Sequence, residues 1–584
     1  MFARKAAGIL SDLNEGRVGS GGAIIRVGPR LQGGWDFISQ EVGMSGKLLP
    51  RVFTALAVLI GAASAISQDA LNRHRVVLDA SGKLGSWVQP QSRAYDRVMR
   101  LAWDFLLRRA PVESNGLKAY LTYCCLNPET LEAKDWPHNP AGLYGMFADS
   151  AAAYYAYSGD REVVKLVQSM LDYQLAHGMT PAGWDWPNVP YASSDAGADD
   201  YRGADENHYC KLARLSKIPC GTGDGRGVIE PDKLGELGIG YLKFYELTGE
   251  GRYLEAALAS ANGLARHVRA GDSDHSPWPF RAYAEDNKIL EEYSSNVIGP
   301  IRLFDELIRL KLGDVYAFGR ARDMAWQWLM AYPMRNHRWA GYFEDVRIFE
   351  KPTNFNQYTA METARYLMLH PQDDSKWQRD VPELISWVEK TFVVDVPREA
   401  AVQWGANALS EQLIDMNKMG SHTSRYASIN ALWYEKTGDR AAKEKAFRSF
   451  NWATYMCRED GRVLVGPVDQ TIWFSDGYGD YIRHFMAGLG AVPEWAPPDE
   501  NHLLRSSSIV REISYGSQKI SFRTFDDDST EVLRLNFKPH RILAGGKSLA
   551  RRGDLSAPGW TFEPASRVLR IRHAASNQIE VIGR

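Results

Sequence analysis

The stretch Leu432-Trp433-Tyr434-Glu435-Lys436-Thr437-Gly438-Asp439 decides the fold, because it ends one aromatic-rich helix and begins another. Glycine readily adopts the left-handed conformation that terminates a helix, and an aspartate side chain accepts hydrogen bonds from the first N–H groups of the next helix. The same unit recurs along the chain. Its other copies end at Gly159-Asp160, Gly249-Glu250 and Gly313-Asp314, and a weaker copy ends at Pro371-Gln372-Asp373.

After each turn the apolar residues resume the three- and four-residue spacing of an amphipathic helix. After Asp160 they are Val163, Val164, Leu166, Val167, Met170 and Leu171. With an earlier hairpin expected over residues 95–131, the pattern predicts about six helical hairpins. Long Gly-, Pro- and Trp-rich loops lie between them, at residues 181–200, 204–230, 272–292, 333–357 and 461–480. Because long loops on a helical frame are usually functional, we expect a mostly α-helical (α/α)6 toroid whose loops gather at one mouth.

The chain changes character after Pro497-Pro498. From Ser507 onward, short runs of alternating apolar and polar residues are separated by turn residues such as Gly545-Gly546, as is typical of antiparallel strands. We therefore expect the toroid over residues 66–498 and a small C-terminal antiparallel β-sandwich over residues 499–584, with the sandwich supporting the fold.

Residues 44–65 have the three regions of a signal peptide in order. The basic segment 44–51 precedes the uncharged stretch 52–65, and Ala63-Ser64-Ala65 matches the small-x-small cleavage pattern. The apolar part is too short to span a bilayer comfortably. We expect residues 1–43 to be an upstream extension from a start codon placed too early, and the mature protein to be exported to the periplasm or the medium. The alternative is a buried apolar helix after a genuine extension.

The composition favours a globular protein and supplies many aromatic side chains. Of 584 residues, 45% are apolar and 24% charged, which are ordinary values. A net charge of −2 gives no bulk attraction to nucleic acid or an anionic membrane. The 18 Trp and 27 Tyr provide flat faces for sugar rings, although large cores use aromatic residues as well.

The acidic, Gly-rich loop over residues 204–232 is where we expect the chemistry. Glycoside hydrolysis usually needs one protonated and one ionised carboxyl group. The candidates are Glu230 and Asp232, together with Asp205 and Glu206. Glu230 is the preferred general acid. Asp232 follows Pro231 and has an alternative role at the positive N-terminus of a helix, and Asp205 and Glu206 have an alternative role as helix caps.

A uronic acid substrate adds a carboxylate that needs a cation or several hydrogen-bond donors, and arginine binds carboxylates bidentately. The residues expected to contact substrate are His208, Arg226, His422, Arg483 and His484.

The loop after Gly461 is the second choice for the catalytic pair. It carries Asp469, Asp476 and Asp480, and its Trp473 and Tyr478 form either a sugar platform or part of the core.

The sequence gives no sign of a phosphate loop, a metal site or a cofactor. No Gly-Lys-Ser/Thr follows the glycines at 221–227, and no His-Glu-x-x-His spacing is present. The five cysteines fit no zinc spacing, and a Cys210–Cys220 disulfide is a possibility that the spacing leaves open.

The Gly-Asp-turned hairpins with a β-sandwich tail resemble the six-hairpin glycosidase superfamily over nearly all of residues 95–584. The layout, including the stretch Trp473 to Phe485, is most similar to glycoside hydrolase family 154, a β-glucuronidase-type family. The resemblance implies exo-hydrolysis of a glycan containing β-glucuronic acid, and it transfers no catalytic residue. An unsaturated uronyl hydrolase is an alternative on the same fold.

Two alternatives belong to other classes. A polysaccharide lyase needs a Tyr or His base and an Asn or Arg to neutralise the uronate, and such residues are present at 207–209, 356–358 and 422–426. A non-catalytic glycan-binding protein is the other, although it has no need of paired carboxylates.

Overall fold

The computed structural model describes residues 70–204, 225–341, 353–394, 402–413 and 415–584. The predicted signal peptide, most of the acidic loop and its Asp205, Glu206, His208, Cys210 and Cys220 lie outside these ranges.

Six helices of the described chain form a closed ring. They are α3 (Pro140–Ser158), α6 (Pro231–Thr248), α8 (Ile298–Leu310), α11 (Gln357–Leu369), α13 (Gly420–Thr437) and α15 (Tyr481–Ala491). Each contacts the next in this order, and α15 returns to contact α3. They are the inner helices, since α13 is buried continuously from Gly420 to Leu432. The predicted toroid is confirmed.

A second set of helices covers the ring from outside. They are α4 (Arg161–His177), α7 (Gly251–His267), α9 (Val315–Ala331), α12 (Trp377–Phe392) and α14 (Arg440–Thr454), with the short α10 (Pro333–Asn336) after α9. Each of the long ones packs against the inner helix that precedes it in the chain. In α12 the apolar buried residues are Val381, Leu384, Ile385, Val388 and Phe392, which is the spacing of a helix with one covered face.

The Gly-Asp turns work as the sequence predicts. Gly159 and Gly438 end α3 and α13 in the left-handed conformation, with φ of 74° and 79°. Asp160 and Asp439 then cap α4 and α14 by accepting hydrogen bonds from backbone N–H groups.

The expected hairpin over residues 95–131 is wrong. Helix α2 (Ala94–Asp104) continues into one π-helical turn, η2 (Phe105–Arg109), and Pro111 then prevents further helix. The rest of this fully described stretch contains only the short η3 (Ala119–Leu121) and β3 (Cys125–Leu126). Helix α2 instead packs against α14 and α15, so the sixth helical pair joins the two ends of the toroid.

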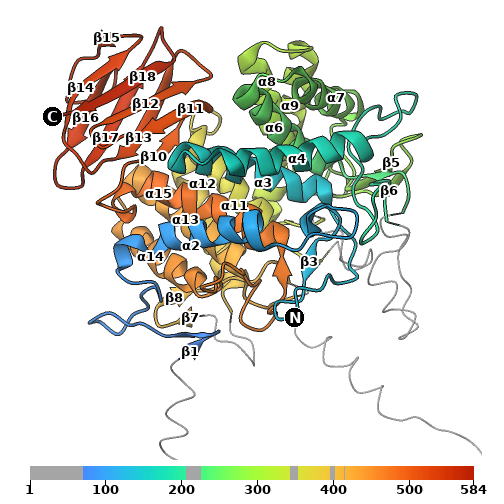
Figure 1. Ribbon diagram of the computed structural model, residues 1–584. Coiled ribbons are helices and arrows are strands. Elements are labelled where there is room, and N and C mark those ends of the chain that lie inside the picture. The colour runs from blue at the N-terminus through green and yellow to red at the C-terminus, as the bar shows by residue number, and fades with distance from the viewer. Residues whose placement is uncertain (1–69, 205–224, 342–352, 395–401, 414) are drawn as a thin grey trace, which may run out of the picture. The chain divides into compact units, whose positions relative to one another are not determined.

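The C-terminal region is a sandwich of two antiparallel sheets, drawn in red in Figure 1. One sheet has the order β10-β13-β17-β16 and the other β11-β12-β18-β14-β15. The strands are β10 (His502–Ser506), β11 (Val510–Tyr515), β12 (Lys519–Thr524), β13 (Ser529–Arg534), β14 (Pro539–Ala544), β15 (Lys547–Ser548), β16 (Gly559–Glu563), β17 (Val568–His573) and β18 (Gln578–Gly583). Strands β10 and β11 also contact α3, which joins the sandwich to the toroid.

Short two- and three-stranded ladders brace the loops between the helices. They pair β1 (Ala70–Leu71) with β2 (His74–Arg75), β3 with β9 (Ile472–Trp473), β4 (Val228–Ile229) with β5 (Arg281–Tyr283) and β6 (Ile289–Glu291), and β7 (Val402–Gln403) with β8 (Ala406–Asn407). Within the part of the chain that is described, every helix is too short or too polar to cross a membrane.

Candidate active site

A cavity of about 230 Å³ lies where the N-terminal ends of the inner helices meet. Asn139 and Met146 come from the start of α3, Lys233 from α6, Tyr358 from α11 and His422 from α13. The π-helical turn η4 (Ser475–Asp480), which leads into α15, completes the wall. Since the loops that precede these helices gather at the same end, this pocket is the mouth that the sequence predicts.

His422 contacts two carboxylates in this pocket. Its Nε2 lies 3.1 Å from Glu411 Oε1 and 3.5 Å from Asp476 Oδ1. The three ligand-type atoms all lie within 4.8 Å of one another. The His422 side chain is only 2% exposed, whereas Glu411 and Asp476 are 19% and 18% exposed and both line the cavity. Two carboxylates therefore face the cavity above a buried imidazole.

The other side of the ring determines where the His422 proton lies. Nδ1 is 2.6 Å from Arg425 Nη1 and 2.5 Å from Gln357 Nε2. A guanidinium group only donates, so Nδ1 holds a lone pair and the ring proton is on Nε2, toward the carboxylates. A metal ion binds Nε2 only by displacing this proton.

The pKa values in this cluster are shifted by burial and by the opposed charges. Burial lowers the pKa of His422, but Glu411 and Asp476 outweigh it and raise the value to about 9. That value favours a ring protonated on both nitrogens. A proton on Nδ1, however, would point at the Arg425 guanidinium, which is itself a donor, and this contact would be repulsive. We therefore take the His422 ring to be neutral. Burial also raises the pKa of Glu411, with His422 acting in the opposite direction.

Two serine hydroxyls hold the Asp476 carboxylate in place. Its Oδ1 accepts a hydrogen bond from the Ser421 hydroxyl at 3.0 Å, and its Oδ2 accepts one from the Ser475 hydroxyl at 3.1 Å. Asp476 therefore faces the cavity in a fixed orientation.

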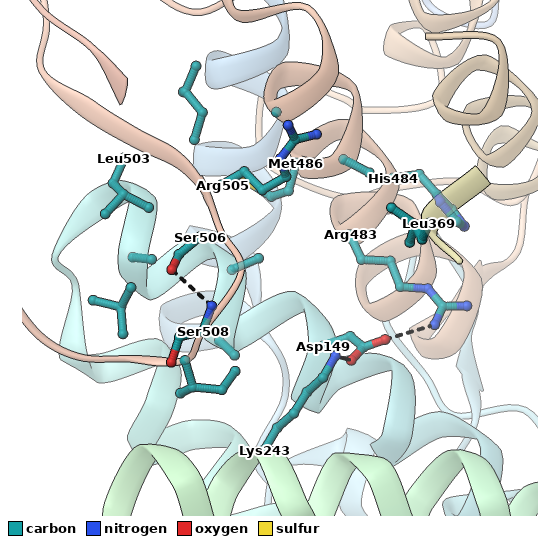
Figure 2. Close-up of a pocket in the computed structure, with 18 of the residues that line it drawn as sticks. Asp149, Lys243, Leu369, Arg483, His484, Met486, Leu503, Arg505, Ser506 and Ser508 are labelled. Carbon is teal, nitrogen blue, oxygen red and sulfur yellow. Dashed lines mark hydrogen bonds and ion pairs between the residues drawn. The ribbon is translucent and has the colours of Figure 1, made fainter. Parts of the chain in front are cut away.

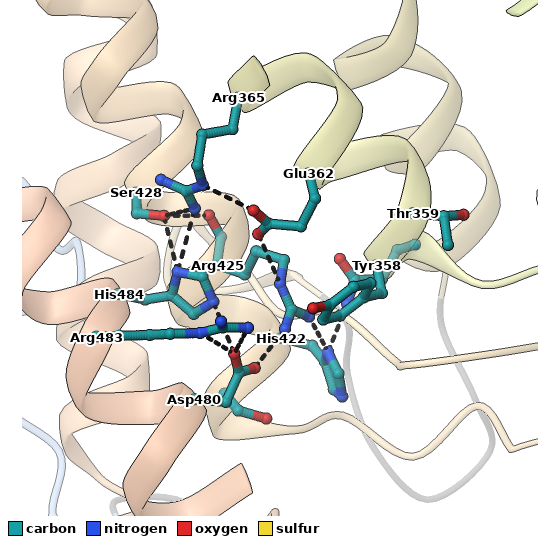
Figure 3. Close-up of polar contacts among 12 residues, drawn as sticks. Tyr358, Thr359, Glu362, Arg365, His422, Arg425, Ser428, Asp480, Arg483 and His484 are labelled. Carbon is teal, nitrogen blue, oxygen red and sulfur yellow. Dashed lines mark hydrogen bonds and ion pairs between the residues drawn. The ribbon is translucent and has the colours of Figure 1, made fainter. Parts of the chain in front are cut away.

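Below the cavity a chain of buried charges runs along the toroid axis (Figure 3). Arg425 pairs with Asp480 and lies 3.2 Å from Glu362, and it covers the Tyr358 ring at 4.2 Å. Asp480 also accepts from Arg483. Its Oδ1 lies 3.1 Å from His484 Nε2, and Glu362 in turn accepts from Arg365. This network orients Arg425, and through Arg425 it holds the His422 ring in one position.

Two tryptophans form the aromatic wall of the cavity. Trp136 and Trp473 meet edge to face, with ring centroids 5.3 Å apart. The β3–β9 ladder, in which Trp473 pairs with Cys125, holds the second of them. Tyr478 instead lies in the core, where it stacks on Phe105. Of the predicted platform, the structure places Trp473 at the cavity and Tyr478 away from it.

The preferred acidic pair lies beside the cavity and not in its lining. Glu230 is the N-cap residue of α6 and is fully buried, and its Oε1 accepts a hydrogen bond from Arg281 Nε at 2.9 Å. Arg281 also donates to Glu291 at 3.1 Å. Asp232 lies in the first turn of α6, where its Oδ1 accepts from the Lys233 N–H at 2.8 Å. Asp232 therefore lies at the helix start, as the alternative role that the sequence offers requires, whereas the Glu230 side chain pairs with Arg281 and makes no capping hydrogen bond.

The remaining predicted contacts are dispersed. Arg226 is exposed, 3.8 Å from Asp195, and is not among the residues that line the pocket. Arg483 and His484 belong to the axial network and line a different cavity. Asp469 and Asp480 do line the pocket with Asp476, so the loop that ranked second in the sequence supplies more of the site.

Glu411 and Lys233 are the site residues that sequence reasoning missed. Backbone contacts bring Glu411 to the pocket. The Gln357 N–H donates to the Glu411 carbonyl oxygen, and Gln412 forms an isolated β-bridge with Asn356. Nothing in the local sequence signals these long-range contacts. Lys233 follows the predicted Asp232, and its position in the first turn of an inner helix was the available signal.

Comparisons with known proteins find similarity in structure alone. No protein-family model and no curated protein matches the sequence. One similar structure is a cellobiose 2-epimerase from Spirochaeta thermophila DSM 6192, with 10% identity over 69% of this chain and 97% of that chain and a TM-score of 0.49. Another is a family 76 glycoside hydrolase from a bovine Bacteroides thetaiotaomicron strain, with 12% identity, 70% and 79% coverage and a TM-score of 0.45.

A third similar structure is an unsaturated glucuronyl hydrolase specific for heparin, with 9% identity, 68% and 96% coverage and a TM-score of 0.39. Each of the three is named for its action on a carbohydrate. The fold assignment rests on the ring of helices described above, and membership of glycoside hydrolase family 154 stays a prediction.

Proposed function

We propose that this protein is a glycoside hydrolase that acts on glycans containing uronic acid, with Glu411 and Asp476 as its catalytic carboxyl pair. The observation that carries the proposal is the pair of carboxylates facing the cavity above His422, at the mouth of the toroid. Hydrolysis of a glycosidic bond needs one carboxyl group that gives a proton and one that is ionised.

Glu411 is the general acid in this proposal. Partial burial raises its pKa, which keeps a proton available for the leaving oxygen. Asp476 is the ionised partner, supported by the Ser421 and Ser475 hydroxyls. His422 is a positioning residue, since its Nε2–H lies between the two carboxylates while Arg425 fixes the ring from behind.

The stereochemical outcome follows from the spacing of the pair. Carboxyl groups about 5 Å apart suit a retaining mechanism, whereas an inverting one needs roughly 6.5–9.5 Å to admit a water molecule. One oxygen of Glu411 and one of Asp476 lie within 4.8 Å of each other. The proposal therefore includes retention of the anomeric configuration, with Asp476 as nucleophile.

The cavity has the groups that a sugar acid requires. Trp136 and Trp473 offer flat faces to the sugar ring. The Lys233 ammonium group lines the wall and supplies positive charge for the substrate carboxylate, although it also lies 4.0 Å from Asp232. A β-glucuronide is the specific substrate we propose, on the basis of the sequence resemblance.

A polysaccharide lyase is the second candidate, because Tyr358 lines the same cavity. The test is incubation with an aryl β-D-glucuronide and with uronate oligosaccharides. Hydrolysis releases the aglycone or a reducing end with no new absorbance in the near ultraviolet. Elimination produces an absorbing double bond and identifies a lyase. Consumption of only those substrates that already carry the double bond identifies an unsaturated uronyl hydrolase, and binding without turnover overturns the enzyme proposal.

Export to the periplasm or the medium is also part of the proposal, on the strength of residues 44–65. N-terminal sequencing of the mature protein tests it. A first residue close to Ile66 supports cleavage after Ala65, and a mature chain that retains residues 44–65 contradicts it.

A further inference from the structure

A second cavity, of about 310 Å³, lies at the opposite end of the inner helices, against the β-sandwich (Figure 2). Lys243 of α6 and Arg365 of α11 come from the C-terminal halves of their helices and Asp149 from the middle of α3, whereas the active-site residues lie closer to the N-terminal ends. Strand β10 and the start of β11 close the other side. The half-exposed Leu369 is one of the lining residues, so the cavity is open to solvent.

The polar end of this cavity has more positive than negative groups. The cations that line it are Lys243, Arg302, Arg365 and Arg483, and the carboxylates are Asp149 and Glu362. Arg505, on the sandwich side of the cavity, is paired with Glu435. The neighbouring ion pair of Arg425 and Asp480 leaves the excess of positive charge unchanged. Glu236, which lies outside the cavity, reduces this excess but does not remove it. His484 adds no charge, because burial lowers its pKa to about 3.

Arg302 is the cation with no close partner. Asp149 is occupied by Lys243 and Arg483, and Glu362 by Arg365 and Arg425. Within the described chain Arg302 makes no hydrogen bond and no ion pair, and Asp149 attracts it at longer range. An anion bound among these cations accepts charge-assisted hydrogen bonds from them.

The opposite wall is apolar and small. It consists of Ala152, Ala153 and Ala156 of α3 together with Leu503, Leu504, Ile509 and Val510 of the sandwich. Figure 2 shows Leu503, Ser506 and Ser508 across the cavity from Asp149, Lys243 and Arg483. The space suits a molecule with one anionic group and a compact body, and the volume is at the lower end of that for ligand sites.

The second cavity is separate from the active site. Between the two lies a constriction of only about 10 Å³, lined by Met146, Tyr358 and Glu362 among others. That is room for about one water molecule, so a sugar cannot pass.

We propose that this second cavity is a binding site for a monosaccharide-sized molecule that carries one carboxylate or phosphate group, held at Arg302, Lys243 and Arg365. The three cations come from separate inner helices, α8, α6 and α11, so the bound anion links three helices of the ring. This inference does not depend on the proposed glycosidase activity, because its test measures binding alone.

The test is isothermal titration calorimetry of the full chain with D-glucuronate, D-glucose 6-phosphate and neutral D-glucose. We expect saturable binding of at least one anionic sugar and none of glucose, and the two anions distinguish carboxylate from phosphate. Arg302→Gln is expected to weaken binding at least about tenfold, the loss of one charge-assisted contact. The matched control is Arg320→Gln, which removes an exposed arginine of α9 and is expected to change nothing.

Two further variants identify the site. Ala153→Met fills the second cavity and is expected to abolish the binding, so the test does not rely on a single charge change. Trp473→Ala alters the active-site wall and is expected to leave the binding intact. Absence of saturable binding by wild type overturns the proposal. It is also overturned if Arg320→Gln weakens binding as much as Arg302→Gln does, or if Trp473→Ala abolishes the binding and Ala153→Met does not.

Discussion

Glu230 and Arg281 show, at the residue scale, how a carboxylate with the sequence features of a catalytic acid is used for structure. Arg281 is buried between Glu230 and Glu291 and ties the start of α6 to the β4–β5–β6 ladder. The local sequence gives the charge and the helix start, but the partner is 51 residues away. Burial and a long-range ion pair decide the role, and neither can be predicted from the loop itself.

The Arg281 network predicts unequal effects of two substitutions on stability. Arg281→Met leaves two buried carboxylates without the cation that bridges them, and it is expected to lower the free energy of unfolding by about 3–5 kcal/mol. Glu230→Gln leaves the Arg281–Glu291 pair and is expected to cost about 1–2 kcal/mol. Denaturant unfolding of both variants measures this, and a larger loss for Glu230→Gln contradicts it.

Among the site residues, His422 and Trp473 could be predicted, and Glu411 could not. His422 lies at the start of an inner helix, and Trp473 lies in a loop whose aromatic and acidic residues already indicate a site. Glu411 reaches the pocket only through backbone contacts with the start of α11. A residue that is positioned by a partner distant in sequence leaves no periodic pattern.

At the scale of elements, the hairpin turns depend on neighbouring residues and could be predicted from the sequence. The short distances between the inner helices could not. Gly159 and Asp160 determine where α3 ends and α4 begins. In contrast, Gly235 of α6 is needed because the backbone of α8 packs directly against it. A Cβ added at Gly235 comes within 2.2 Å of Pro300 N in α8. The partner of α2 was mispredicted for the same reason, since α15 comes from the far end of the toroid.

This contrast predicts opposite signs for one substitution at two helical glycines. Gly235→Ala forces α6 away from α8 and is expected to lower the free energy of unfolding by about 2 kcal/mol or more. At Gly319 in α9 an added Cβ meets no atom within 4 Å. Gly319→Ala is therefore expected to raise the free energy of unfolding by about 0.5–1 kcal/mol, from helix propensity alone. Thermal unfolding of the pair measures both, and equal shifts contradict the account.

For the molecule as a whole, two histidines buried without charge make stability depend on pH. Burial lowers the pKa of His138 to about 3, and it lowers that of His484 to about 3 against the opposing effect of Asp480. In the unfolded chain a histidine titrates near 6.5. The folded pKa is the lower one, so the unfolded state binds more protons. The contribution of these two histidines to the free energy of unfolding is therefore fully present above pH ~6.5 and is lost as the pH falls toward 3.

His138→Phe isolates one of these contributions, because among the described residues the His138 ring nitrogens have no hydrogen-bond partner to lose. Each such histidine costs about 1.4 kcal/mol per pH unit below pH 6.5. We expect the slope of unfolding free energy against pH, between pH 6 and 4.5, to fall by about that amount in the variant. An unchanged slope indicates that His138 takes up a proton in the folded protein.

The central claim is that Glu411 and Asp476 are the catalytic pair, and the most direct measurement is kcat for Glu411→Gln and Asp476→Asn on an aryl β-D-glucuronide. Asp469→Asn, in the same cavity, is the control. We predict that each of the first two variants lowers kcat by about 10²–10⁴-fold with unfolding curves like that of wild type, and that the control stays within a few-fold. Wild-type kcat in both Glu411→Gln and Asp476→Asn, or an equal loss in Asp469→Asn, contradicts the assignment.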